Sequence, residues 1–304
     1  MPQSRTWETW PRDHCTARRL RAWQPAAAVS TTPGGQPPPT RAASGHLHVT
    51  EHGESGPRVA FLHGLFGQGR NWTTIAKSLA DHSRVLLVDL PNHGRSGWTE
   101  RFSYPDMAAQ IADLLATRSA DPAKLVGHSM GGKVAMLVAL TRPELVERLC
   151  VVDVSPVDYP RRSSFVSYVA GMRSLGLQDL PDRATADAAL QPYEPDPVIR
   201  SFLLQNLRRD KAPGGHGWRW QLNLDLLSRV MDEVGDWPDI DAPPYEGPVL
   251  WVAGANSDYI RPEYADLMRT LFPRVRLVTV KNAGHWVHSE QPEVFLAILR
   301  RFLG

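Results

Sequence analysis

Short apolar runs that alternate with segments of helical periodicity are the feature that most restricts how this chain can fold. Six such runs are Val59 to His63, Val85 to Asp89, Leu125 to His128, Leu149 to Val154, Val249 to Ala253 and Val275 to Val280. Helices are expected near residues 71–81, 105–117, 130–140, 262–271 and 292–303. Strands that are apolar on both faces and alternate with helices build parallel sheets covered on both sides. The pattern predicts an α/β fold with a mostly parallel central sheet, in one domain over residues 45–304.

The alternation is interrupted between Pro156 and Pro248 by a stretch that reads as several helices with no convincing strand. An all-helical insertion at about residues 157–247 would lie above the carboxyl ends of the strands, where open α/β sheets hold their ligands. We therefore expect a helical lid. Its apolar and aromatic side chains fit an acyl pocket or simply the lid's own core, and they are Phe165, Tyr168, Met172, Phe202, Leu203, Leu207, Trp218 and Trp220.

The first 44 residues have a different composition. They hold seven of the 26 prolines, and their six arginines against two acids give a net charge of +4. They lack the continuous apolar core of a secretory signal and look more like an organelle transit segment. We expect a disordered leader and a mitochondrial location, with a passive tail on a cytoplasmic or plastid protein as the alternatives.

The rest of the chain carries a net charge of −2, since the whole chain carries +2. This balance gives no reason to expect a nucleic-acid partner. The two cysteines, Cys15 and Cys150, have neither a disulfide-framework nor a metal-ligand spacing. Apolar runs such as Val134 to Leu140 are too short to cross a bilayer, so no transmembrane segment is expected.

A candidate nucleophile lies in the sequence "KLVGHSMGGKVAM", residues 124–136. Gly127 to Gly131 fits G-x-S-x-G, and it sits between an apolar strand and a helix, as a nucleophile elbow requires. Glycines flank Ser129 because larger side chains would clash in such a turn. The alternative is an ordinary serine that caps a helix.

A second loop, "FLHGLFGQGRNW" at residues 61–72, follows another strand and should reach the same sheet edge. Backbone amides of Leu65 and Met130 would then be placed to form an oxyanion hole. A dinucleotide-binding loop is the competing interpretation. It is disfavoured because the glycines at 64, 67 and 69 have the spacing G-x-x-G-x-G instead of G-x-G-x-x-G.

A candidate base follows the last strand, in "NAGHWVHSEQP" at residues 282–292. His285 lies between the final strand and the final helix, where a base would meet Ser129 in the chain order Ser, acid, His. His288, three residues later, is the alternative.

These motifs, together with "DLPNHGRS", "RPELVERL" and "VVDVSPVDY", resemble the α/β-hydrolase superfamily, and more closely its alpha/beta hydrolase domain-containing protein 11 group and related bacterial esterases. The resemblance covers about residues 46–304 and excludes the leader. It implies an α/β-hydrolase fold with a lid inserted between two strands. It also implies an association of the group with mitochondria and with the upkeep of 2-oxoglutarate dehydrogenase.

The acid of the expected triad has three candidates. In many α/β-hydrolases it lies in a glycine-led turn after the lid, and here that position in "GANSDYIRP" is Ser257, with Asp258 one residue late. Some members use the end of the strand before the lid, which is Asp153 in this chain. We favour Asp153, with Asp258 and then Asp225 in the lid as alternatives.

The expected chemistry is ester hydrolysis through an acyl-enzyme, with Ser129 as nucleophile, His285 as base and Asp153 as its orienting acid. It requires no metal or organic cofactor. A small acyl ester and a lipid ester fit equally well as substrate. Epoxide hydrolases and dehalogenases are disfavoured, because they use a carboxylate where this chain has Ser129. The alternative function is a hydrolase-fold binding protein that protects a mitochondrial partner enzyme.

Overall fold

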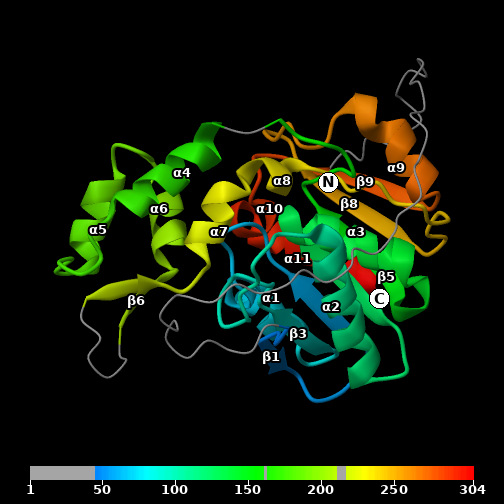
Figure 1. Cartoon of the computed structure of the whole chain (residues 1–304). Helices are drawn as coiled ribbons and strands as arrows, with labels where there is room; N and C mark the ends of the chain where they lie inside the picture. The colour runs from blue at the N-terminus through cyan, green and yellow to red at the C-terminus, as the bar shows by residue number, and fades with distance from the viewer. Residues whose placement is uncertain (1–44, 161–162, 211–216) are drawn as a thin grey trace, which may run out of the picture.

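A seven-stranded sheet forms the centre of the computed structural model, which describes residues 45–160, 163–210 and 217–304 (Figure 1). Its strand order is β1-β3-β2-β4-β5-β8-β9. The strands are β1 (Val49–His52), β2 (Arg58–Leu62), β3 (Arg84–Val88), β4 (Ala123–His128), β5 (Val146–Val152), β8 (Val249–Gly254) and β9 (Val275–Val280). All neighbouring pairs are parallel except β1 with β3. The predicted mostly parallel sheet is confirmed.

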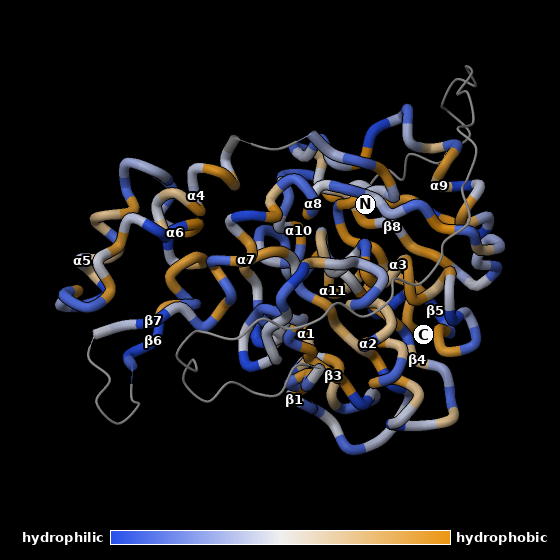
Figure 2. The backbone as a smooth tube through the Cα atoms, in the orientation of Figure 1, coloured by the Kyte–Doolittle hydropathy of each residue, from blue (hydrophilic) through white to orange (hydrophobic). Residues whose placement is uncertain are grey.

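Helices cover both faces of the sheet and bury its apolar side chains. One face packs against α2 (Tyr104–Arg118), α3 (Met130–Thr141) and α9 (Ala265–Leu271). The other packs against α1 (Thr73–Leu79) and α11 (Pro292–Leu303). The 3-10 turns η2 (Gly69–Trp72), η3 (Pro143–Leu145) and η4 (Pro262–Tyr264) and the short α10 (Val287–Glu290) complete the domain. Figure 2 shows hydrophobic stretches gathered toward the middle of the sheet domain, with hydrophilic stretches more common in the peripheral loops.

The edge strand β1 was not expected from the sequence. Its four residues VTEH are partly or fully exposed, so they lack the apolar signal of the inner strands. It closes one edge by pairing antiparallel with β3, from Val49 opposite Val88 to His52 opposite Val85.

An insertion leaves the sheet after β5 and returns at β8 (Figure 1). It contains α4 (Ser163–Ser174), α5 (Arg183–Leu190), α6 (Pro197–Leu204), α7 (Leu224–Arg229) and α8 (Met231–Gly235). It also contains an antiparallel hairpin of β6 (Leu207–Arg209) and β7 (Trp218–Trp220). The expectation of a segment without strands was therefore wrong. Each hairpin strand has three residues and includes arginine, so neither produces an apolar run.

The carboxyl ends of the parallel strands meet at one edge of the sheet. Strand β4 lies between β2 and β5, so the loops that follow these three strands are neighbours. In the described part of the chain, no helix is both long and apolar enough to span a membrane. The leader, residues 1–44, lies outside the described residues.

Candidate active site

Ser129 occupies a sharp turn between β4 and α3, with φ of 52° and ψ of −120°. This conformation is strained for a residue other than glycine, by on the order of 1–3 kcal/mol. The amide of Ser129 donates to the carbonyl of Val152 at 3.0 Å and holds the turn against β5. A Cβ atom at Gly131 would lie 2.5 Å from the carbonyl oxygen of His63, so the turn can approach β2 only with glycine there.

His285 connects Ser129 to Asp153 in one hydrogen-bonded row. The Ser129 hydroxyl lies 3.0 Å from Nε2 of His285, and Nδ1 of the same ring lies 2.8 Å from Oδ2 of Asp153. Asp153 follows β5 with φ of 51° and is completely buried. A carboxylate at Nδ1 favours the tautomer whose Nε2 accepts a proton from the serine.

Two further donors hold the Asp153 carboxylate. The amide of Gly254 donates to Oδ1 at 3.0 Å, and the hydroxyl of Ser257 donates to Oδ2. Ser257 is the residue at the position where many family members carry the acid. In the sequence Ser257 appears only as a departure from the usual acid position. Its contact with Asp153 was not visible there, because the two residues follow different strands.

The other two acid candidates lie elsewhere. Asp258 is exposed and forms an ion pair with Arg261 at 3.3 Å, and Asp225 is exposed on α7. Within the described residues, Asp153 is the only carboxylate hydrogen-bonded to the His285 imidazole.

His128 holds the backbone of His285. Its Nε2–H donates to the His285 carbonyl oxygen at 2.8 Å, and the two rings lie 4.7 Å apart. Burial, and then the proximity of His285, lower the pKa of His128 well below its usual value. His128 is thus neutral near pH 7. On its outer side the His285 ring stacks on Tyr259, with centroids 4.0 Å apart. Neither contact was predictable from the sequence.

Two buried histidines shape the loop after β2. His63 donates from Nδ1 to the carbonyl of Gly64 at 2.8 Å, while its Nε2 accepts from the amide of Leu90 at 2.9 Å. The amide of Phe66 donates to His93 at 3.3 Å. Burial lowers the pKa of His63 to about 4, and burial together with the charge of His63 lowers that of His93 to about 3.

His288, the alternative base, is packed away from the serine. Its ring stacks on Trp72 with centroids 4.1 Å apart, and its Nδ1 is buried without a hydrogen-bond partner in the described structure. Burial, and then the charge of His285, lower the pKa of His288 to about 3.

Leu65 and Met130 were predicted to supply backbone amides for an oxyanion hole. Met130 is the first residue of α3, and the first amides of a helix have no acceptor within it. The amide of Phe66 is taken by His93, whereas that of Leu65 finds no protein acceptor in the described part of the chain. Leu65 and Met130 both line the same pocket as Ser129.

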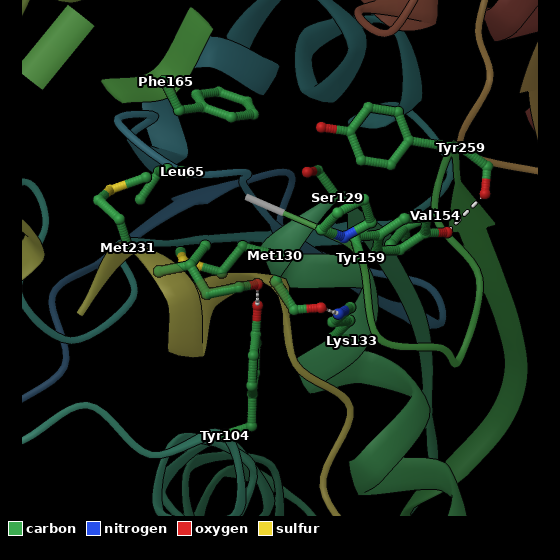
Figure 3. Close-up of a pocket in the computed structure, with 13 residues that line it drawn as sticks. Leu65, Tyr104, Ser129, Met130, Lys133, Val154, Tyr159, Phe165, Met231 and Tyr259 are labelled. Carbon is green, nitrogen blue, oxygen red and sulfur yellow. Dashed lines mark hydrogen bonds between the residues drawn. The ribbon is translucent and has the colours of Figure 1, made fainter. Parts of the chain in front are cut away.

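That pocket has a cavity volume of about 50 Å³ and is partly open to solvent. Figure 3 shows side chains from the sheet domain and from the insertion around Ser129. The insertion contributes six of the lining residues, namely Tyr159, Pro160, Phe165, Met231, Val234 and Gly235. The other lid residues that the sequence singled out do not line it. Six of them are buried in the insertion, namely Tyr168, Met172, Leu203, Leu207, Trp218 and Trp220. The eighth, Phe202, packs edge-to-face against Trp286.

Within the described residues, no cluster of three or more His, Cys, Asp or Glu side chains could hold a metal ion. Cys150 is completely buried in β5, and burial raises the pKa of its thiol above the usual range. It therefore offers no thiolate.

Comparison with known proteins shows the family to which this fold belongs. Residues 57–292 match the family described as alpha/beta hydrolase fold. The chain belongs to the α/β-hydrolase family. It is 41% identical to the sn-1-specific diacylglycerol lipase ABHD11 of Mus musculus over 253 residues, which cover 81% of each chain.

More distant relatives of this α/β hydrolase include microbial esterases. Esterase YbfF of Escherichia coli (strain K12) is 30% identical, over 81% of this chain and 92% of its own. Among solved structures, a marine microorganism esterase is 33% identical with a TM-score of 0.81, over 84% of this chain and 98% of its own.

Proposed function

We propose that this esterase/lipase-type α/β hydrolase cleaves carboxylic esters through an acyl-enzyme formed on Ser129. The observation that carries the proposal is the hydrogen-bonded row from Ser129 through His285 to buried Asp153, with its serine end in a pocket. The family's named esterases and lipases support ester bonds as the target.

In the first half-reaction the Ser129 oxygen attacks the ester carbonyl, and Nε2 of His285 takes the hydroxyl proton. The proton then passes to the leaving alcohol as the acyl-enzyme forms. In the second half-reaction water attacks the acyl-enzyme and gives a proton to Nε2 of His285. His285 returns this proton to the Ser129 oxygen as its bond to the acyl carbon breaks and the carboxylic acid leaves. Asp153 stays ionised, orients the ring and stabilises the imidazolium.

The amides of Leu65 and Met130 would stabilise the negative oxygen of each tetrahedral intermediate. An oxyanion donor typically contributes about 3 kcal/mol to the transition state. Leu65 lies in the loop held by His93, Met130 is the first residue of α3, and both line the pocket of Ser129, which supports this role. The positive end of the α3 dipole adds to the same effect.

The substrate we propose is an ester with an apolar acyl group, and an acylglycerol is the class favoured by the named activity of the ABHD11 relatives. Leu65, Val154 and Phe165 give the pocket apolar walls suited to a hydrocarbon chain. In this proposal the insertion acts as the lid, because Phe165 and Met231 belong to it and line the pocket that contains Ser129 (Figure 3).

Labelling with a fluorophosphonate tests the nucleophile. The purified protein should react covalently with the probe and hydrolyse p-nitrophenyl esters, and Ser129→Ala should lose both. Folding of each variant is checked by circular dichroism. A folded wild type that is neither labelled nor active would exclude the proposal and favour the alternative of a binding protein.

The orienting acid is tested by three single substitutions. Asp153→Asn should lower turnover by about 10⁴-fold, as loss of the triad acid does elsewhere. Asp225→Asn and Asp258→Asn are matched controls, since both carboxylates are exposed and away from His285. If Asp153→Asn keeps near wild-type turnover while a control loses it, the acid has been misassigned.

A further inference from the structure

Six arginines from separate stretches of the chain gather where the insertion meets the sheet domain. This arginine cluster consists of Arg70 in η2, Arg95 after β3, Arg183 in α5, Arg208 and Arg209 in β6, and Arg219 in β7. Five of the six are exposed, and Arg208 is half-buried. The cluster plays no part in the ester chemistry proposed above.

Three members converge on backbone carbonyls at the end of α6. Arg70 donates to the carbonyl of Gln205 at 2.9 Å. Arg183 and Arg208 donate to the carbonyl of Leu207 at 2.7 Å and 3.1 Å. The carboxyl end of a helix attracts cations through its exposed carbonyls. A carbonyl carries no net charge, so these bonds fix the guanidinium groups without neutralising them.

Carboxylates do not neutralise the cluster either. In the described part of the chain, none of the six forms an ion pair within 4.0 Å. Asp89, Asp182 and Asp210 adjoin it, which leaves positive charge in excess. The oxygens of Asp89 accept from the backbone amides of Gly69 and Arg95, at 2.7 Å and 2.8 Å.

The cluster is a local feature in a domain of opposite net charge. Burial, and then the positive charges of four other cluster members, lower the pKa of Arg208. The chain after the first 44 residues nevertheless carries a net charge of −2. The net charge of this part of the chain gave no reason to expect a polyanionic partner. It is a sum over the whole domain and does not show the local positive surface.

The form of the cluster distinguishes between anionic partners. Its members are exposed on a surface rather than lining a cavity, which suits an extended array of phosphates better than one small ion. Bases of single-stranded nucleic acid would need exposed aromatic platforms, whereas Trp218 and Trp220 beside the cluster are only 8% and 9% exposed. Arg209 lies over the Trp218 ring at 4.4 Å, which holds this guanidinium in place.

We propose that the arginine cluster docks the protein on the anionic phospholipid headgroups of a membrane surface. Guanidinium groups pair with phosphate through two parallel hydrogen bonds. Helix α6 adds an apolar contact, since Val198 at its start is 69% exposed and lies about 9 Å along the helix from the cluster-bound end.

Docking through the arginine cluster would bring the pocket near a substrate in the membrane. This consequence rests on the proposed hydrolysis of lipid esters. The side chain of Asn206, between α6 and the hairpin, donates to the carbonyl of Phe66 at 2.8 Å. Phe66 follows Leu65, which lines the pocket. The segment between α6 and the hairpin, which adjoins the arginine cluster, is therefore in direct contact with the loop that forms part of the pocket wall.

The test is sedimentation of the full-length protein with vesicles of phosphatidylcholine, alone or mixed with phosphatidylserine. We expect partition onto the mixed vesicles only, weakening as salt rises. Arg95→Gln with Arg219→Gln is the informative double variant, because neither side chain makes a hydrogen bond within the described structure. It should lower partition by about 30-fold, or about fivefold for each arginine.

Arg84→Gln with Arg276→Gln is the matched control, with the same change in charge on exposed residues near the amino ends of β3 and β9. It should change partition by less than about threefold. Equal partition onto both vesicle types, or an equal loss in the control pair, overturns the proposal. A preference for a resin that carries polyglutamate, or for single-stranded DNA, over mixed vesicles also overturns the proposal.

Hydrolysis of a water-soluble p-nitrophenyl ester is measured on the same samples. It should be unchanged in both double variants, because none of the four arginines lines the pocket. Loss of vesicle binding with full hydrolysis confirms the docking role separately from catalysis. A protein that binds mixed vesicles but never hydrolyses esters would refute the proposed function and leave the docking surface standing.

Discussion

Asp153 and Ser257 show how two positions share one function at the scale of single residues. The hydroxyl of Ser257 donates to the same oxygen of Asp153 that faces Nδ1 of His285. The turn after β8 therefore still contributes to holding the imidazole, although it carries no acid at this position. An acid placed at residue 257 would start close to His285.

Exchange of the two side chains tests this relationship. Asp153→Ser alone should lose about 10⁴-fold in turnover. Adding Ser257→Asp should recover a measurable part of that loss, because the carboxylate returns to the neighbourhood of His285 Nδ1 from the other strand. Turnover of both variants on p-nitrophenyl acetate is the measurement. Ser257→Asp in the wild-type background is the control, and no recovery in the double variant would contradict the shared role.

The sequence could identify Ser129 and His285 because short motifs on defined strand ends carry them. It could favour Asp153 only by the absence of an acid at residue 257. His128 and Tyr259, which hold His285 from two sides, could not be found in this way. Their contacts join segments more than 20 residues apart, and nothing in the local pattern distinguishes them from ordinary core residues.

At the scale of elements, both ends of the insertion are tied to α3 by one side chain. Lys133, only 2% exposed, donates to the carbonyls of Val157 at 3.1 Å and Asp236 at 2.8 Å, and also to that of Gly235. Tyr104 on α2 donates to the carbonyl of Val234 at 2.7 Å (Figure 3). These bonds set the position of the pocket wall relative to Ser129.

Lys133→Met should therefore loosen the pocket while leaving the Ser129, His285 and Asp153 side chains in place. The three carbonyls lose their donor, and we expect stability to fall by about 3 kcal/mol. The Michaelis constant for p-nitrophenyl esters should rise more than the turnover number falls. Tyr104→Phe, which removes a single bond, should show a smaller change of the same kind. A fall in turnover alone, with an unchanged Michaelis constant, would contradict this role.

The elements themselves were predictable where burial produces a strong pattern. Six of the seven strands of the central sheet and the main helices appear close to their expected positions. The five inner strands are almost entirely buried, and the edge strand β9 is still rich in valine and leucine. Strand β1 and the β6–β7 hairpin were missed for the opposite reason. They are short, and tertiary contacts rather than their own side-chain pattern hold them in the strand conformation.

At the scale of the whole molecule, buried neutral histidines make folding sensitive to acid. Burial is the first cause that lowers the pKa values of His63 to about 4 and of His93 and His288 to about 3, whereas an unfolded histidine titrates near 6.5. Below pH 6.5 the unfolded chain binds more protons than the folded one. Stability is therefore full above about pH 6.5 and is lost as pH falls toward 3–4.

Urea unfolding at a series of pH values between 7 and 4 measures this effect. Each of these histidines should contribute a slope of up to about 1.4 kcal/mol per pH unit. His288→Phe should flatten the dependence, because phenylalanine keeps the stacking on Trp72 and has no proton to bind. An unfolding free energy that stays constant from pH 7 to 4 would refute the prediction.

The place where the insertion joins the sheet also bears on how such proteins diversify. The insertion departs after β5 and returns at β8, two strands that pair directly, with Val152 opposite Val252. The two ends of the insertion meet beside Lys133. An insertion of another length or sequence can therefore begin and end there without altering the register of any strand. The pocket wall is in this sense an exchangeable module, and substrate range can diverge while the inherited reaction centre stays unchanged.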